Sequence, residues 1–129
     1  MRFSVLILGI LIGILSVSSC QKKETTIVHP IVGTWVQFDV HDYKVYEKTD
    51  HLDDNHGGMI FYENGDLVMR ENAGFCGTPP ITYGNFEGKW ELLDDTHIQL
   101  TYDNWDGEKS YKMEIISLDD TSLEWDYVP

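Results

Sequence analysis

Basic residues are scarce in this chain. Nine lysines and arginines stand against 22 aspartates and glutamates, so the formal net charge is −13 at pH 7. Binding to phosphate backbones needs the opposite balance of charge, so we expect no nucleic acid among the partners. A cation, a basic protein or simply a well-solvated surface fits this composition better.

The common catalytic motifs are also missing. The chain contains no Gly-x-Ser-x-Gly, no His-Glu-x-x-His and no phosphate-binding loop. Carboxylates are so abundant that two of them would lie close together in any fold, and such a pair would carry no information. We therefore predict that the protein is not an enzyme and that it needs no cofactor.

One long apolar run is present, and it lies at the start of the chain. It extends from Phe3 to Val17 behind a single basic residue, Arg2. This is shorter than the roughly 20 residues that a membrane-spanning helix requires. A basic start, a short apolar segment and small residues at its end are typical of a secretory signal. Residues 1–19 are therefore predicted to be a signal peptide that is removed.

The apolar run ends in Val17-Ser18-Ser19-Cys20. This stretch resembles the lipobox of bacterial lipoproteins. The resemblance implies that the signal is cut before Cys20, that its thiol carries diacylglycerol and that its amine is acylated, for example with palmitate. Such chains bind a bilayer firmly, because each buried methylene contributes about 0.8 kcal/mol. We expect a lipid-anchored protein of the cell envelope, most simply at the outer membrane, on its periplasmic or its cell-surface side.

The second and last cysteine is Cys76. If Cys20 carries lipid, Cys76 has no disulfide partner within the chain. It lies in the loop Gly74–Pro80, where it could close the mouth of a barrel, bind a soft metal or pair with another molecule. Burial as a small apolar residue is the usual fate of a free cysteine, and we favour it here.

Residues 20–30 form a polar tether, and residues 31–129 form one domain without sustained helical periodicity. The clearest segment is Phe86–Leu92, in which apolar or small residues alternate with charged ones, as in a half-buried strand. Pairs such as Asn64-Gly65 and Asp106-Gly107 are typical of hairpin turns. Further strands are expected at 31–40, 43–46, 59–62, 67–71, 97–103, 109–118 and from 123 onward. About eight antiparallel strands joined by short turns predict an all-β sandwich or an up-and-down barrel.

Four segments occur in a characteristic order: Gly33-Thr34-Trp35, then FYENGDL, EGKWELLDDTHIQLTY and ISLDDTSLEW. This series resembles the lipocalin-like domains of bacterial lipoproteins, which belong to the calycin superfamily. It covers about residues 31–128. The resemblance implies a meander barrel with Trp35 packed across its closed end, and binding of a small hydrophobic ligand inside.

The candidate pocket residues are the large aromatic side chains predicted to point inward. An eight-stranded barrel is barely wider than its own side chains, so these rings either fill the interior or line a pocket for one small ligand. They are Trp35, Phe86, Trp90, Tyr102, Tyr111, Trp125 and Tyr127.

Two acidic loops offer further candidates. His51, Asp53, Asp54 and His56 have the chemistry of metal ligands, but their spacing matches no established motif, and we favour no metal site. Trp105 lies in a loop rich in Asp and could anchor a protein partner.

Two functions therefore remain open. We predict a membrane-anchored carrier of a small hydrophobic ligand. The alternative is a filled acidic barrel that binds a basic protein in the envelope, for example as an inhibitor of a wall-degrading enzyme.

Overall fold

The computed structural model describes residues 27–39, 41, 44–74 and 77–129. The predicted signal peptide, Cys20 and Cys76 lie outside the described residues, so the interpretations that concern them stay predictions.

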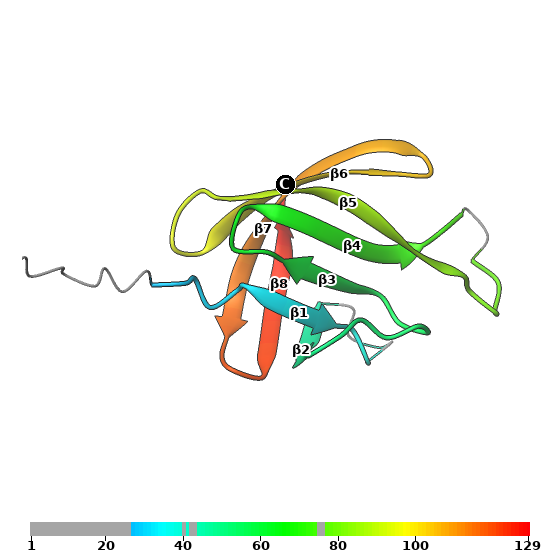
Figure 1. Ribbon diagram of the computed structural model, residues 1–129, viewed down its shortest axis with the longest axis horizontal. Coiled ribbons are helices and arrows are strands. Elements are labelled where there is room, and N and C mark those ends of the chain that lie inside the picture. The colour runs from blue at the N-terminus through cyan, green and yellow to red at the C-terminus, as the bar shows by residue number, and fades with distance from the viewer. Residues whose placement is uncertain (1–26, 40, 42–43, 75–76) are drawn as a thin grey trace, which may run out of the picture.

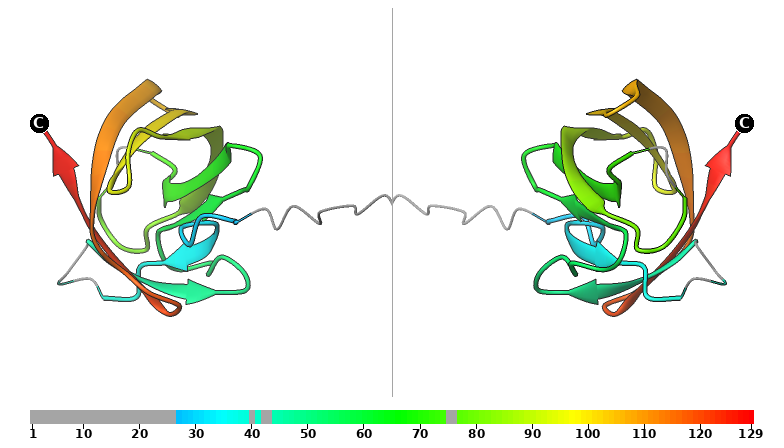
Figure 2. Two further views of the ribbon diagram at one scale, coloured as in Figure 1. Left: turned by 90° about the vertical axis from the view of Figure 1, so that its left-hand side faces the viewer. Right: turned by 90° about the vertical axis from the view of Figure 1, so that its right-hand side faces the viewer.

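The described residues form a closed barrel of eight antiparallel strands, which confirms the predicted all-β barrel (Figure 1). In Figure 2 the strands wrap around a common interior. The strands are β1 (Gly33–Val36), β2 (Val45–Thr49), β3 (Gly58–Phe61), β4 (Asp66–Asn72), β5 (Tyr83–Leu92), β6 (His97–Asn104), β7 (Gly107–Leu118) and β8 (Ser122–Val128).

The strands from β3 to β8 follow one another around the barrel in chain order, whereas β1 lies between β2 and β3. Residues 50–57 therefore carry the chain from the end of β2 past β1 to the start of β3. Tight turns join β3 to β4, β5 to β6, β6 to β7 and β7 to β8, whereas the β1–β2 and β4–β5 connections are longer. Gly65 and Gly107 adopt positive φ angles of 92° and 105° in two of these turns, a conformation that glycine adopts without steric cost.

The strand register explains which residues fill the interior. Met69 pairs with Phe86, Leu67 with Gly88, and Gly88 in turn with Tyr102. Alternate residues of each strand therefore face inward, as the period-two pattern of Phe86–Leu92 predicted. The members of the core share almost complete burial: they are Ile31, Trp35, Tyr46, Met59, Phe61, Leu67, Met69, Ile98, Leu100, Tyr102, Met113, Leu123 and Trp125.

We call the end where β1 begins the closed end, because Trp35 and Ile31 are fully buried there. The Trp35 indole Nε1 donates to the Ile31 carbonyl oxygen at 2.8 Å. The Lys48 ammonium lies 5.3 Å from the centroid of the Trp35 ring, within range of a cation–π contact. Together these contacts seal one end of the barrel.

The first strand is shorter than predicted. The sequence pattern extended it to Val40, but β1 ends at Val36, and the Phe38 side chain is exposed. The Asp39 carboxylate accepts the backbone N–H of His41 at 2.7 Å. This local turn competes with the sheet ladder for the backbone, and the strand stops before it.

Aspartates also fix the turns between the later strands. The Asp94 carboxylate accepts backbone N–H groups from Thr96 and His97 at 2.9 and 2.8 Å. The Thr96 N–H and then the His97 ring hold the pKa of Asp94 at about 2, because they stabilise its ionised form. Asp119 repeats the arrangement with Thr121 and Ser122.

Gly88 is a packing requirement of the barrel. A Cβ at this position would lie 2.2 Å from the Thr101 carbonyl oxygen and 2.8 Å from the Tyr102 Cα, both backbone atoms. Gly88→Ala should therefore destabilise the fold by about 1–3 kcal/mol through overpacking. Urea unfolding followed by tryptophan fluorescence measures this free energy.

Gly77→Ala is the matched control, because nothing lies within 4 Å of a Cβ at Gly77. It should leave the unfolding midpoint where it is. Equal midpoints for the two variants would contradict the packing argument.

Candidate functional site

A hollow of about 200 Å³ lies at the end of the barrel opposite Trp35, which we call the open end. Five aromatic residues from four segments line it: Tyr46 of β2, Tyr83 of β5, Tyr111 of β7, and Trp125 and Tyr127 of β8. The closed half of the interior is packed with side chains, so the free space lies among these rings.

Successive rings contact one another and form what we call the aromatic arc. Tyr46 lies 6.0 Å from Trp125, and Trp125 lies 4.9 Å from Tyr127, measured between ring centroids. The arc continues from Tyr127 to Tyr111 at 5.0 Å and from Tyr111 to Tyr102 at 6.1 Å. Most of these contacts are edge-to-face, the arrangement that aromatic quadrupoles favour.

A carboxylate belongs to the same hollow. Glu71 follows Leu67 and Met69 on the inward face of β4, and it lines the hollow. Its oxygens accept hydrogen bonds from the Tyr102 hydroxyl at 2.8 Å and from Asn104 Nδ2 at 2.7 Å. The carboxylate is thereby fixed beside the end of the aromatic arc.

The indole of Trp125 contributes an unused hydrogen-bond donor. Trp125 is only 3% exposed and lines the hollow, and its Nε1 has no partner. An unsatisfied buried donor costs about 1–3 kcal/mol. Among the buried side-chain nitrogens and oxygens that the structure describes, this atom alone has no hydrogen bond.

The tyrosines around the hollow are held in their neutral form. Burial, and then the neighbouring Tyr127 and Glu71, raise the pKa of Tyr46 well above its usual value. Burial followed by the Glu71 carboxylate does the same for the pKa of Tyr102. Burial also raises the pKa of Tyr111. These hydroxyls are therefore hydrogen-bonding groups and not anions at neutral pH.

Comparison with known families agrees with this architecture. The model of the lipocalin-like domain family matches residues 31–125. The chain belongs to the lipocalin-like domain family. No curated protein and no solved structure matches the chain.

The predicted pocket residues divide between the two halves of the lipocalin-like barrel. Tyr111, Trp125 and Tyr127 line the hollow, and Tyr102 contacts it through Glu71. Trp35 lies at the closed end, away from these residues.

Phe86 and Trp90 belong to the wall of β5 and pack against the core without lining the hollow. Trp90 contacts the Phe61 ring at 5.6 Å between centroids, and its Nε1 donates to the Tyr62 carbonyl oxygen at 2.8 Å.

Glu71 was not among the residues that the sequence singled out. The signal for it was available, because Leu67, Met69 and Glu71 are spaced two apart in the predicted fourth strand. If β4 alternates as Phe86–Leu92 does, these three side chains share the inward face, and Glu71 is the carboxylate among them. Tyr46 was missed because β2 is too short to show a clear alternation. Tyr83 was missed because β5 begins there, before the segment Phe86–Leu92 in which the alternation is clear.

The histidine-rich link between β2 and β3 holds its candidate metal ligands in separate pairs. His56 pairs with Asp53 at 2.6 Å, His51 pairs with Asp50, and Asp54 lies 3.8 Å from Arg70. Among the described residues, no group of three or more His, Cys, Asp or Glu side chains converges.

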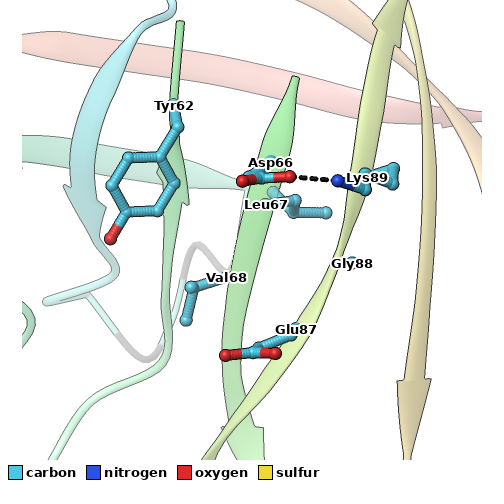
Figure 3. A pocket seen from close by; sticks show the side chains of 7 residues that line it. All are labelled: Tyr62, Asp66, Leu67, Val68, Glu87, Gly88 and Lys89. Atoms are coloured by element: carbon cyan, nitrogen blue, oxygen red, sulfur yellow. Dashed lines mark hydrogen bonds and ion pairs between the residues drawn. The ribbon is translucent and has the colours of Figure 1, made fainter. Parts of the chain in front are cut away.

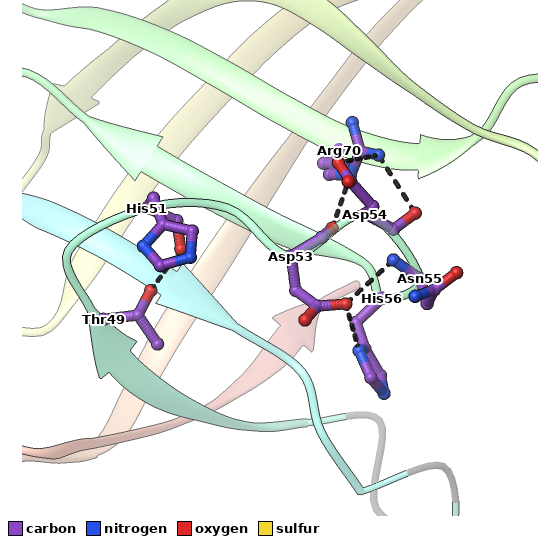
Figure 4. Close-up of polar contacts among 7 residues, drawn as sticks. All are labelled: Thr49, His51, Asp53, Asp54, Asn55, His56 and Arg70. Carbon is purple, nitrogen blue, oxygen red and sulfur yellow. Dashed lines mark hydrogen bonds and ion pairs between the residues drawn. The ribbon is translucent and has the colours of Figure 1, made fainter.

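Arg70 of β4 holds this link against the barrel (Figure 4). Its Nε donates to the Asp53 carbonyl oxygen at 2.8 Å, and its Nη2 to the Asp54 carbonyl oxygen at 3.1 Å. Its Nη1 donates to Asn85 Oδ1 at 2.7 Å. Gly57, which lines the hollow, follows directly after this clamped segment.

A larger hollow of about 510 Å³ lies against the outer surface of β4 and β5 (Figure 3). Its polar rim comes from Asp66 and Lys89, which form an ion pair, and from Glu87. Leu67 beneath it is part of the packed core. Unlike the open-end hollow, it has no unpartnered buried group, and we do not assign it a ligand.

Two further features concern surfaces and membranes. Trp105 lies in the β6–β7 turn and is 46% exposed. Within the part of the chain that the structure describes, no helix has the length and the apolar character needed to cross a membrane.

The Arg70 clamp should matter for stability. Arg70→Ala leaves two loop carbonyls and Asn85 without their charged donor, so we expect a loss of about 1–3 kcal/mol and faster hydrogen exchange in residues 52–57. Chemical unfolding and hydrogen–deuterium exchange measure these two effects. Asp54→Asn, which touches only the long ion pair, should change neither, and similar behaviour of the two variants would contradict the clamp.

Proposed function

We propose that the protein is a lipid-anchored carrier whose lipocalin-like barrel binds a small, largely apolar molecule at its open end. The observation that supports this most directly is the 200 Å³ hollow lined by five aromatic residues. Aromatic walls with a few placed polar groups are typical of small-molecule sites. Glu71 and the Trp125 indole are such polar groups.

The size of the hollow limits the ligand. Pockets for drug-sized molecules measure roughly 300–1,000 Å³, and the open-end hollow is smaller. Its volume corresponds to about six or seven water molecules at about 30 Å³ each. A single ring or a short chain fits this space, whereas a long fatty acid would need the closed half, which Trp35 and its neighbours fill.

The anchor is proposed from the sequence around Cys20, and the fold supplies an orientation for it. Ile31 is buried against Trp35, so the segment that precedes it enters the barrel at the closed end. A chain attached through Cys20 would therefore be tethered through its closed end. The open-end hollow would then lie at the end away from the tether.

Ligand binding is tested by native mass spectrometry of the full chain, released gently from mild detergent. We expect a reproducible small adduct that disappears on unfolding. Tyr127→Ala should weaken it, because this variant removes one ring of the aromatic arc. Ile116→Ala should not, because Ile116 is similarly exposed, at 54% against 51% for Tyr127, but does not line the hollow.

The bare chain mass, together with no uptake from a mixture of small aromatic and aliphatic compounds, would contradict the carrier function. Binding of a basic protein to the acidic surface around Trp105 would then be the function to test.

The anchor is tested with the two cysteines as a matched pair. Cys20→Ser should abolish incorporation of labelled palmitate and move the protein from the membrane fraction to the soluble fraction. Cys76→Ser should change neither. Membrane attachment that survives Cys20→Ser would contradict lipidation at this residue.

A further inference from the structure

We propose that the ligand of the open-end hollow is a small organic cation: an alkylammonium group whose molecule also carries an oxygen acceptor. This inference rests on the proposed ligand binding and adds the chemical class of the ligand. Three features of the hollow carry it: an acidic group without a cationic partner, a set of aromatic rings, and an indole N–H without an acceptor.

The first feature is the Glu71 carboxylate. Both of its recorded donors, the Tyr102 hydroxyl and the Asn104 amide, are neutral. None of the ion pairs among the described residues includes Glu71. Its charge is therefore left for a ligand to neutralise, in a half-buried place where solvent screens attraction less than at an open surface.

Arg70 is a cationic residue among those that line the hollow, but it does not fill this role. Its three guanidinium nitrogens already donate to the Asp53 and Asp54 carbonyl oxygens and to Asn85. Arg70 lies one position from Glu71 in β4, so the alternation of the strand places it on the opposite face. Its donors hold the loop and are not available to an anionic ligand.

The second feature is the aromatic lining. The negative faces of tyrosine and tryptophan rings attract cations, and several rings around one site are the usual means of binding quaternary ammonium groups. Tyr46, Tyr83, Tyr111, Trp125 and Tyr127 supply five rings in one small space. After burial and Tyr127, the Glu71 carboxylate also raises the pKa of Tyr46, which lines the same hollow.

The third feature is Trp125 Nε1, which has no acceptor. A hydroxyl or carbonyl oxygen on the ligand would satisfy it. A plain hydrocarbon would satisfy neither Trp125 nor Glu71, and an anion would satisfy Trp125 but be repelled by Glu71. A cation that also carries an oxygen meets both requirements.

The test compares two probes of the same shape, choline and its neutral carbon isostere 3,3-dimethylbutan-1-ol, by calorimetric titration of the full chain in mild detergent. We expect choline to bind about tenfold more tightly or better, because only the cation gains from the rings and from Glu71. Equal or tighter binding of the neutral isostere would overturn the cationic class and leave ligand binding itself standing. Absence of binding by both probes, with no adduct in mass spectrometry, would overturn the proposed function as well.

Two carboxylate variants locate the effect. Glu71→Gln keeps an acceptor for Tyr102 but removes the charge, and it should lower choline affinity about tenfold while leaving the isostere within about twofold. Glu87→Gln makes the same charge change on the outer face of β5 and should leave both affinities unchanged. Equal losses of choline affinity in the two variants would overturn the assignment to Glu71.

Trp125→Phe provides an independent variant. It keeps an aromatic ring and removes the N–H, so choline should bind several-fold more weakly, whereas tetramethylammonium, which has no oxygen, should bind as before. Parallel changes for the two cations would overturn the role of the indole.

Discussion

An eight-stranded barrel encloses so little space that its own inward side chains nearly fill it, and the other features of this protein follow from that limit. Residues such as Ile31, Trp35 and Phe61 are completely buried in the closed half. Gly88 is needed because Tyr102 and the backbone of β6 already occupy the space where its side chain would lie. Free volume remains at the open end, where the inward side chains are mostly tyrosines instead of aliphatic residues. The proposed ligand site is therefore small and lies at one end.

The polar groups of that site are retained at a cost to stability. The Trp125 N–H is buried without a partner, and Glu71 is a carboxylate on the inward face of a strand. Apolar residues of similar shape would avoid both penalties. The proposed ligand would complete these hydrogen bonds and balance this charge. The closed half of the same barrel contains no comparable group among the residues described.

Much of the fold follows from local sequence patterns. The alternation in Phe86–Leu92 predicts β5, and Asn64-Gly65 and Asp106-Gly107 predict the turns at their observed places. The position of β1 between β2 and β3 could not be predicted in this way, because strand order depends on pairing between distant segments. The end of β1 at Val36 was missed because the apolar pattern continues beyond it. The Asp39 turn takes up the backbone N–H of His41 and competes there with strand pairing. Glu71 was missed because its role depends on which face of β4 is inward, and charge alone suggested an outward position.

The order of the strands also has a consequence for how the barrel forms. Each ladder from β3 to β8 joins strands that are neighbours in the chain, so the entropic cost of pairing them is small. Closure requires β2 to pair with β8, near opposite ends of the domain, through only three register pairs. Long-range pairing of this kind is slow, because the chain loses loop entropy before it gains contacts. We therefore expect the β3–β8 sheet to form first as an open, curved surface and β1 and β2 to dock across it afterwards. Tyr46 lies in β2, so on this order the hollow would be completed only in the final folding step.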